Sequence, residues 1–320
     1  MTAVISNSFG GKLMAVDIET LPQEYREIYD NFIMPVDLDI SLESVILSQE
    51  NKEKIDLFIR EMEHQAEFRK YRLEPLNRIL MFGASGTGKT YSTKALCNHL
   101  GYTMIYIDIA KALSDETVAK NISDIFKLAN YLGHCLIMLD ECDAVAWQRD
   151  TGNSDTGTIR RATNSIFQQL DQMNHTNVFV AATNMLHRLD PAFERRFNLK
   201  LEFRRPQLNL KDAIKHFVDE KNKKLKEDGV GRLFVYVDDV DQTTRDIVGG
   251  RAADSKKLSY YEIEVLVERA MKDAIINGHR NIRTSEIFIA LSKQLNMKLR
   301  FKTDEDPEEI FQSPVDNYNR

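Results

Sequence analysis

The chain has 320 residues, of which 42% are apolar and 29% are charged, and its formal net charge at pH 7 is −6. This length and apolar content predict a globular protein with one large domain and a smaller one attached, and the acidic balance gives no electrostatic sign of direct nucleic-acid binding. No secretory leader pattern lies near Met1 and no apolar run is long enough to cross a bilayer, so we expect a cytoplasmic protein without a membrane contact.

Apolar, β-branched runs alternate with helical patterns between about residues 77 and 203. The predicted strands are "RILMFG" (78–83), "YTMIYIDI" (102–109), "HCLIML" (134–139), "NVFVAAT" (177–183) and "LKLEF" (199–203). Nearly continuous apolar runs are typical of strands buried on both faces, so the pattern predicts an α/β protein with a parallel sheet covered by helices. Cys97, Cys135 and Cys142 fall in these core elements without metal-ligand spacing, which favours buried, reduced thiols.

The pattern changes after Pro206. The stretches "LNLKDAIKHFVDEKNKKLKEDG" and "LSYYEIEVLVERAMKDAI" repeat apolar residues at helical spacing, and Ser259 to Glu262 form a capping-box pattern at the start of the second stretch. A small helical domain is therefore predicted. The stretch "TDEDPEEIFQSPVDNYNR" (303–320) is acidic and interrupted by proline, so we expect a flexible tail.

The stretch "GASGTGKT" (83–90) follows the pattern G-x-x-x-x-G-K-[ST] between a predicted strand and a predicted helix. Its glycines let successive backbone N–H groups curl around phosphate oxygens at a positive helix N-terminus. Lys89 can reach the β- and γ-phosphates, and the Thr90 hydroxyl can bind Mg²⁺. The alternative is a glycine-rich turn that binds nothing. The predicted nucleotide-binding residues here are Gly83, Ala84, Ser85, Gly86, Thr87, Gly88, Lys89, Thr90 and Tyr91.

Carboxylates follow the apolar run of "HCLIMLDECDAVAWQRD". Asp140 at this strand end can hold the Mg²⁺ shell while Glu141 orients and polarises the attacking water; the alternative is a solvated turn. Asn184 follows "NVFVAAT" at the same sheet edge, where its amide can hold the water or the γ-phosphate. Arg195 and Arg196 in "LDPAFERRF" lie at the edge of the domain, although paired arginines are also common surface charges. Together these residues predict a nucleoside triphosphatase.

The order and separation of "GASGTGKT", "MLDECDA", "AATN" and "LDPAFERRF" resemble the AAA family of ATPases within the AAA+ class, and most closely its single-module bacterial and phage-type members. The resemblance covers roughly Val45 to Leu291. It implies a P-loop AAA+ module, with a parallel five-stranded sheet, flanking helices and a small C-terminal helical lid. The implied parts are an N-terminal segment (1–44), a nucleotide-binding domain (45–206), a lid domain (207–302) and an acidic tail (303–320).

The resemblance also implies roles for the site residues. It assigns Asp140 to magnesium, Glu141 to water activation and Asn184 to the first sensor. Arg195 and Arg196 match the arginine finger, which reaches the nucleotide of a neighbouring subunit and so requires a ring, usually a homo-hexamer.

The family also supplies an expectation for the adenine pocket. Backbone and apolar side chains around Val45 and Ile46 would line it. The lid would complete it near Ser259 and Tyr260. The implied cofactors are ATP and Mg²⁺.

Three features depart from the family pattern. At the lid, many members have Gly-Ala where this chain has Tyr260 and Tyr261, so we expect the adenine or ribose contact to be built differently. Many members grip a polypeptide with an aromatic-aliphatic-glycine tripeptide, where this chain has Leu113, Ser114 and Asp115. Tyr106 or Phe126 would supply an aromatic only after a register shift, and both fall within predicted elements. A large N-terminal substrate domain is also not expected, so recruitment would use the short N-terminal segment, the tail or a separate partner.

Two functions follow from these features. In the first, an oligomeric ring hydrolyses ATP with Mg²⁺ and remodels or disassembles a protein complex. In the alternative, a nucleotide-controlled ring loads or switches a partner, such as a replication factor or an effector, without threading a polypeptide. The paired carboxylates and the arginines favour hydrolysis in both.

Overall fold

The computed structural model describes residues 5–8, 13–16, 20–34, 36–113, 117–146, 156–204, 210–239, 259–287, 290, 298–299 and 311–312. The chain divides into two compact units, Met1–Phe203 and Arg204–Arg320. The predicted division into four parts stays a prediction.

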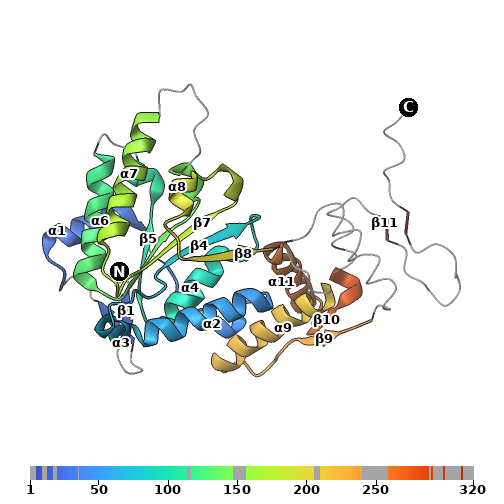
Figure 1. The fold of residues 1–320 in the computed structure, drawn as a ribbon. Helices are drawn as coiled ribbons and strands as arrows, with labels where there is room; N and C mark the ends of the chain where they lie inside the picture. The colour runs from blue at the N-terminus through green and yellow to red at the C-terminus, as the bar shows by residue number, and fades with distance from the viewer. Residues whose placement is uncertain are drawn as a thin grey trace, which may run out of the picture. The chain divides into compact units, whose positions relative to one another are not determined.

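A six-stranded sheet forms the centre of the first unit, with the strand order β3-β5-β6-β7-β4-β8 (Figure 1). The strands are β3 (Ile33–Met34), β4 (Arg78–Gly83), β5 (Thr103–Ile107), β6 (Cys135–Leu139), β7 (Val178–Thr183) and β8 (Leu199–Phe203). Neighbours from β5 to β8 are parallel, which confirms the five predicted strands. The antiparallel edge strand β3 was not predicted, because two residues carry no recognisable period.

Helices cover both faces of this sheet. They are α1 (Gln23–Phe32), α2 (Gln49–Glu63), α3 (Gln65–Lys70), α4 (Lys89–Leu100), α5 (Ile109–Leu113), α6 (Val118–Leu132), α7 (Thr156–Gln172) and α8 (Pro191–Glu194). Ile137 and Leu139 of β6 belong to the core that includes α6 and α7, whereas Leu136 and Met138 belong to the core that includes α2 and α4. Both faces of the strand are therefore buried, as its continuous apolar run requires.

Short elements complete the first unit. They are the 3-10 helices η2 (Leu42–Ser44), η3 (Cys142–Ala144) and η4 (Leu186–Arg188), and the antiparallel pair β1 (Ile5–Ser8) and β2 (Leu13–Val16). The three cysteines are buried free thiols, as predicted, and burial raises the pKa of each. None of the helices in the described ranges combines the length and the apolarity needed to cross a bilayer.

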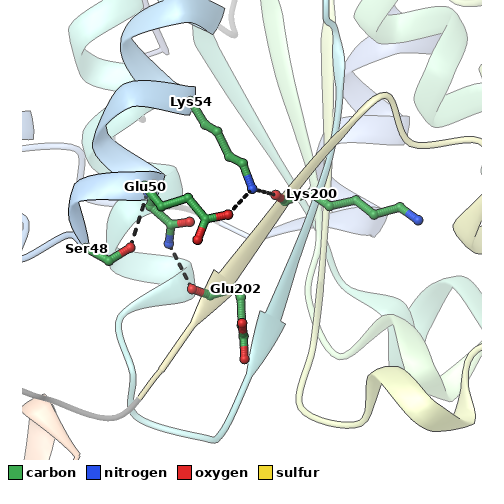
Figure 2. Close-up of polar contacts among 6 residues, drawn as sticks. Ser48, Glu50, Lys54, Lys200 and Glu202 are labelled. Carbon is green, nitrogen blue, oxygen red and sulfur yellow. Dashed lines mark hydrogen bonds and ion pairs between the residues drawn. The ribbon is translucent and has the colours of Figure 1, made fainter.

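Helix α2 covers the backbone of the edge strand β8 (Figure 2). Ser48 caps the helix by accepting from the Asn51 N–H at 3.2 Å, and the Asn51 amide donates to the Glu202 carbonyl at 2.9 Å. Lys54 donates to the Glu50 carboxylate at 2.7 Å and to the Lys200 carbonyl at 3.3 Å. Side chains of α2 thus satisfy backbone acceptors that an edge strand leaves unpaired.

The second unit has its own apolar core around α9 (Leu210–Glu227) and α11 (Tyr260–Ile276). Ser259 and Glu262 form the predicted capping box at the start of α11. Two pairs of short strands were not predicted: β9 (Val235–Val237) with β10 (Asn281–Arg283), which are parallel, and β11 (Lys298–Leu299) with β12 (Phe311–Gln312), which are antiparallel. The rest of the predicted tail lies outside the described residues.

Candidate nucleotide-binding site

The phosphate loop joins the end of β4 to the start of α4. Gly83 has a φ of 147°, and a Cβ at this position would lie 2.0 Å from the Phe203 carbonyl oxygen of β8. Gly86 and Gly88 have φ values of 73° and 96°. Gly88 is the N-cap of α4, so the loop ends where the N–H groups of the first helical turn are free to bind an anion.

Lys89 lies under the loop with 6% of its surface exposed. Its Nζ donates to the carbonyl oxygens of Gly83 and Ala84 at 2.8 and 2.9 Å, and to Asn184 Oδ1 at 2.7 Å. Burial lowers the pKa of this ammonium, while the carboxylate of Asp140 acts in the opposite sense. The structure therefore brings together the predicted lysine and the predicted asparagine, which are 95 residues apart.

Thr90 and Asp140 also meet, at the ends of α4 and β6. Thr90 Oγ1 donates to Asp140 Oδ2 at 2.7 Å, and the half-buried Asp140 accepts the Glu141 N–H on Oδ1 at 2.9 Å. A hydroxyl and a carboxylate are the hard oxygen donors that Mg²⁺ prefers when it binds next to phosphates. The donor set therefore fits Mg²⁺, with Thr90 and Asp140 as the residues that would hold it.

Glu141 follows in the left-handed backbone conformation, with a φ of 50°. This conformation is sparsely populated for residues with a side chain and is found mainly where the surrounding structure requires it. The side chain is exposed, and it makes no hydrogen bond or ion pair within the part of the chain that the structure describes. Its carboxylate is thus available to a water molecule.

Three polar side chains that the sequence did not indicate also support the site. Asp143 Oδ1 accepts from Thr183 Oγ1 at 2.7 Å, and Thr183 Oγ1 accepts the Met185 N–H at 2.9 Å. These bonds fix the turn that carries Asn184. The third is Tyr106, whose hydroxyl donates to Asp140 Oδ2 at 3.0 Å. Burial, and after it the charge of Asp140, raises the pKa of Tyr106, which keeps the hydroxyl a donor.

The predicted adenine-binding residues come from both units. Ser44 Oγ lies 3.0 Å from the hydroxyl of Tyr91 in the first turn of α4, which places the half-buried Val45 and Ile46 near the end of the phosphate loop. Ser259 and Tyr260 belong to the second unit, where Ser259 caps α11. The assignment of these residues to adenine stays a prediction.

Arg195 and Arg196 differ in their surroundings. The Arg196 guanidinium carbon lies 3.8 Å from the centroid of the Phe167 ring, one of its nitrogens lies 3.8 Å from Asp171, and another donates to the Ala192 carbonyl at 3.2 Å. Arg195 is exposed, and its side chain has no partner among the described residues. The Arg196 side chain is therefore held by contacts within the chain, whereas no contact among the described residues holds that of Arg195.

The tripeptide that departs from the family pattern lies largely outside the described residues. Leu113 ends α5, and Ser114 and Asp115 follow in the part that the structure leaves out. Of the two alternative aromatic residues, Phe126 is 0% exposed and stacks on Phe179, and Tyr106 binds Asp140. Phe126 therefore lies in the core, as expected, whereas Tyr106 is only partly buried and its hydroxyl is bound to Asp140.

Comparisons with known proteins show which family part of this chain is similar to. Residues 79–205 match the family described as "ATPase family associated with various cellular activities (AAA)". An uncharacterized AAA family ATPase of Sinorhizobium fredii is 28% identical over 186 residues, which cover 57% of this chain and 56% of that protein.

Two further relatives carry proteasome names. A 26S proteasome regulatory subunit 4 homolog of Saccharomyces cerevisiae is 30% identical over 185 residues, which cover 54% of this chain and 40% of that protein. A putative 26S proteasome regulatory subunit homolog of Methanothermobacter thermautotrophicus is 27% identical over 264 residues, which cover 80% of this chain and 64% of that protein. The chain thus spans about half the length of the curated relatives it matches. On these grounds, residues 79–205 form an ATPase domain of the AAA family.

Proposed function

We propose that this chain hydrolyses ATP with Mg²⁺ in an oligomeric ring and uses the cycle to remodel or disassemble a protein complex in the cytoplasm. The observation that carries the proposal is the convergence of Lys89 on Asn184 and of Thr90 on Asp140, each pair joined by a bond of 2.7 Å. These four side chains meet at one edge of the sheet, where ligands of open α/β sheets bind. Their position supports a role for Lys89 in phosphate binding and for Thr90 and Asp140 in holding Mg²⁺.

Each of these residues would have a separate role in ATP hydrolysis. Backbone N–H groups of the loop and Lys89 would hold the β- and γ-phosphates, and Thr90 and Asp140 would hold Mg²⁺, which neutralises charge on the phosphates when bound. The free carboxylate of Glu141 would orient the attacking water. Asn184 would release Lys89 to the γ-phosphate and then contact that phosphate or the water itself.

We further propose that Arg195, rather than Arg196, acts on the nucleotide of a neighbouring subunit. A guanidinium that crosses an interface has to extend from its own surface. Arg195 is exposed and unpartnered in the described structure, whereas Arg196 is stacked on Phe167. The proteasome names of several relatives support an oligomeric assembly and a protein client, and a homo-hexamer is the assembly we expect.

The test compares two variants. Glu141→Gln should bind ATP with wild-type affinity and lose at least about 100-fold in turnover, because a group that positions the water in phosphoryl transfer contributes at least that much. Lys89→Ala should lose nucleotide binding itself. ATPase rates and the binding of a fluorescent ATP analogue measure both, and near-wild-type turnover by Glu141→Gln would remove that residue from its proposed role.

A second candidate function is favoured by the surroundings of Tyr106 and Phe126, the two aromatic residues nearest to the position of the family's gripping tripeptide. With Phe126 buried and Tyr106 bound to Asp140, neither is free to grip an arbitrary polypeptide, which suits a ring that loads or switches one defined partner. ATP-dependent unfolding of a stable fluorescent reporter with an unstructured tail distinguishes the two. Robust unfolding that Leu113→Ala abolishes would favour threading, and capture of a partner by Glu141→Gln without reporter unfolding would favour the loader or switch.

A further inference from the structure

The carboxylate of Asp140 receives three hydrogen bonds from three different parts of the chain. Oδ2 accepts from Thr90 Oγ1 at 2.7 Å and from the Tyr106 hydroxyl at 3.0 Å, and Oδ1 accepts the Glu141 N–H at 2.9 Å. The first donor comes from the phosphate loop helix and the last from the adjacent residue. Tyr106 is the donor that comes from a separate strand.

The backbone fixes where this hydroxyl lies. Tyr106 stands one residue before the end of β5, and its Cα pairs with that of Met138 in the parallel neighbour β6, two residues before Asp140. On its other side it pairs with Met34 of β3. A side chain on a central strand moves less than one on a loop, so the hydroxyl is a fixed reference point for the carboxylate in the turn that follows β6.

We propose that Tyr106 is a positioning residue for magnesium. Its hydroxyl holds Asp140 Oδ2 toward Thr90, so that the Thr90 hydroxyl and the Asp140 carboxylate face the same ion. This inference rests on the proposed function. A carboxylate near a metal loses affinity when its outer hydrogen-bond partner is removed, because it then rotates among orientations of which few suit the ion. Tyr106 would touch neither the nucleotide nor the metal.

The test is Tyr106→Phe, which removes the hydroxyl and keeps the ring. We expect the Mg²⁺ concentration for half-maximal ATPase activity to rise about tenfold, the lower end of the losses seen when outer-shell partners of metal ligands are removed. Saturating Mg²⁺ should restore most of the turnover. The readout independent of activity is the affinity for a fluorescent ADP analogue, which should fall in MgCl₂ and stay unchanged in EDTA.

A matched control is available four residues earlier. Tyr102 is buried, and its hydroxyl accepts from the Gln65 amide at 3.3 Å, away from Asp140. Tyr102→Phe removes a hydroxyl of the same kind and should leave the Mg²⁺ dependence unchanged. In an Asp140→Ala background, Tyr106→Phe should have no further effect on Mg²⁺-dependent nucleotide affinity, because the two residues act as one unit.

The possible results separate this inference from the proposed function. An unchanged Mg²⁺ dependence in Tyr106→Phe, in a protein whose wild type needs Mg²⁺, overturns the role of Tyr106 alone. An equal loss of analogue affinity in EDTA and in MgCl₂ also overturns it, since the effect would then be structural. A wild-type protein whose nucleotide affinity and turnover ignore Mg²⁺ would overturn both proposals.

Discussion

Gly83 is a single residue on which both the sheet and the phosphate loop depend. Its φ of 147° lies in a region that residues with a Cβ rarely adopt, and the Cβ would overlap the Phe203 carbonyl oxygen at 2.0 Å. The motif pattern predicted a glycine here for phosphate binding. The structure adds a second reason, the close approach of β8.

We therefore expect Gly83→Ala to lower the free energy of unfolding by about 3 kcal/mol, because backbone cannot move aside as a flexible side chain can. Gly157 in α7 is the control: a Cβ there meets nothing within 4 Å, so Gly157→Ala should be neutral or slightly stabilising. Urea unfolding of both variants measures the difference. Equal stabilities would show that β8 yields to the added methyl group.

Arg195 and Arg196 are adjacent in the sequence but have different contacts in the structure. Nothing in "ERRF" distinguishes them, and only the position of α7 beside the turn after α8 gives one of them a partner in another helix. Arg196→Ala should lower the free energy of unfolding by about 1 kcal/mol through the lost ring and carboxylate contacts, whereas Arg195→Ala should change it by less than about 0.5 kcal/mol. Thermal or chemical unfolding of the two variants tests this, and a larger loss for Arg195→Ala would contradict the contrast.

At the scale of elements, the contact between α2 and β8 is a further stabilising feature. Asn51 is 3% exposed, and its amide donates to the Glu202 carbonyl across 151 residues of sequence. Asn51→Ala should cost about 1–2 kcal/mol, since it leaves a partly buried backbone acceptor unpaired. Gln49→Ala removes an exposed bond to Glu53 on the same helix and should cost little. Denaturant midpoints compare the two, and equal shifts would mean that water replaces the Asn51 amide.

The elements that the sequence predicted were those with a strong local pattern of apolar residues. The five parallel strands are continuous apolar runs between helical patterns, and their predicted ends lie within two residues of the observed ones. The short strands β3, β9 and β10 were not predicted, because two or three residues are too few to show a pattern of apolar residues. These strands are defined by their pairing with a neighbouring strand.

At the scale of the whole molecule, the proposed ring predicts complementation between inactive subunits. Arg195→Ala alone should lose about 10³-fold in turnover and Lys89→Ala should lose binding, but a mixture should recover activity, because some interfaces then pair an intact phosphate loop with an intact arginine. The ATPase rate of mixtures at several total concentrations measures this. Replacing the Lys89→Ala partner by a Lys89→Ala/Arg195→Ala double variant should abolish the recovery. Recovery by the double variant, or equal turnover from a monomer, would contradict an arginine that acts across subunits.

The sequence by itself determined the chemistry that depends on neighbours along the chain: the phosphate loop from Gly83 to Thr90, the acidic pair after β6, and the strands and helices that carry them. These features follow from local spacing and period, which one sequence displays directly. Tertiary structure alone decided which strand lies beside which, and so that Tyr106 of β5 meets Asp140 beyond β6, that Thr183 meets Asp143, and that Arg196 is held while Arg195 is not. Strand order and side-chain packing arise from contacts between residues far apart in the chain, which leave no local pattern to read.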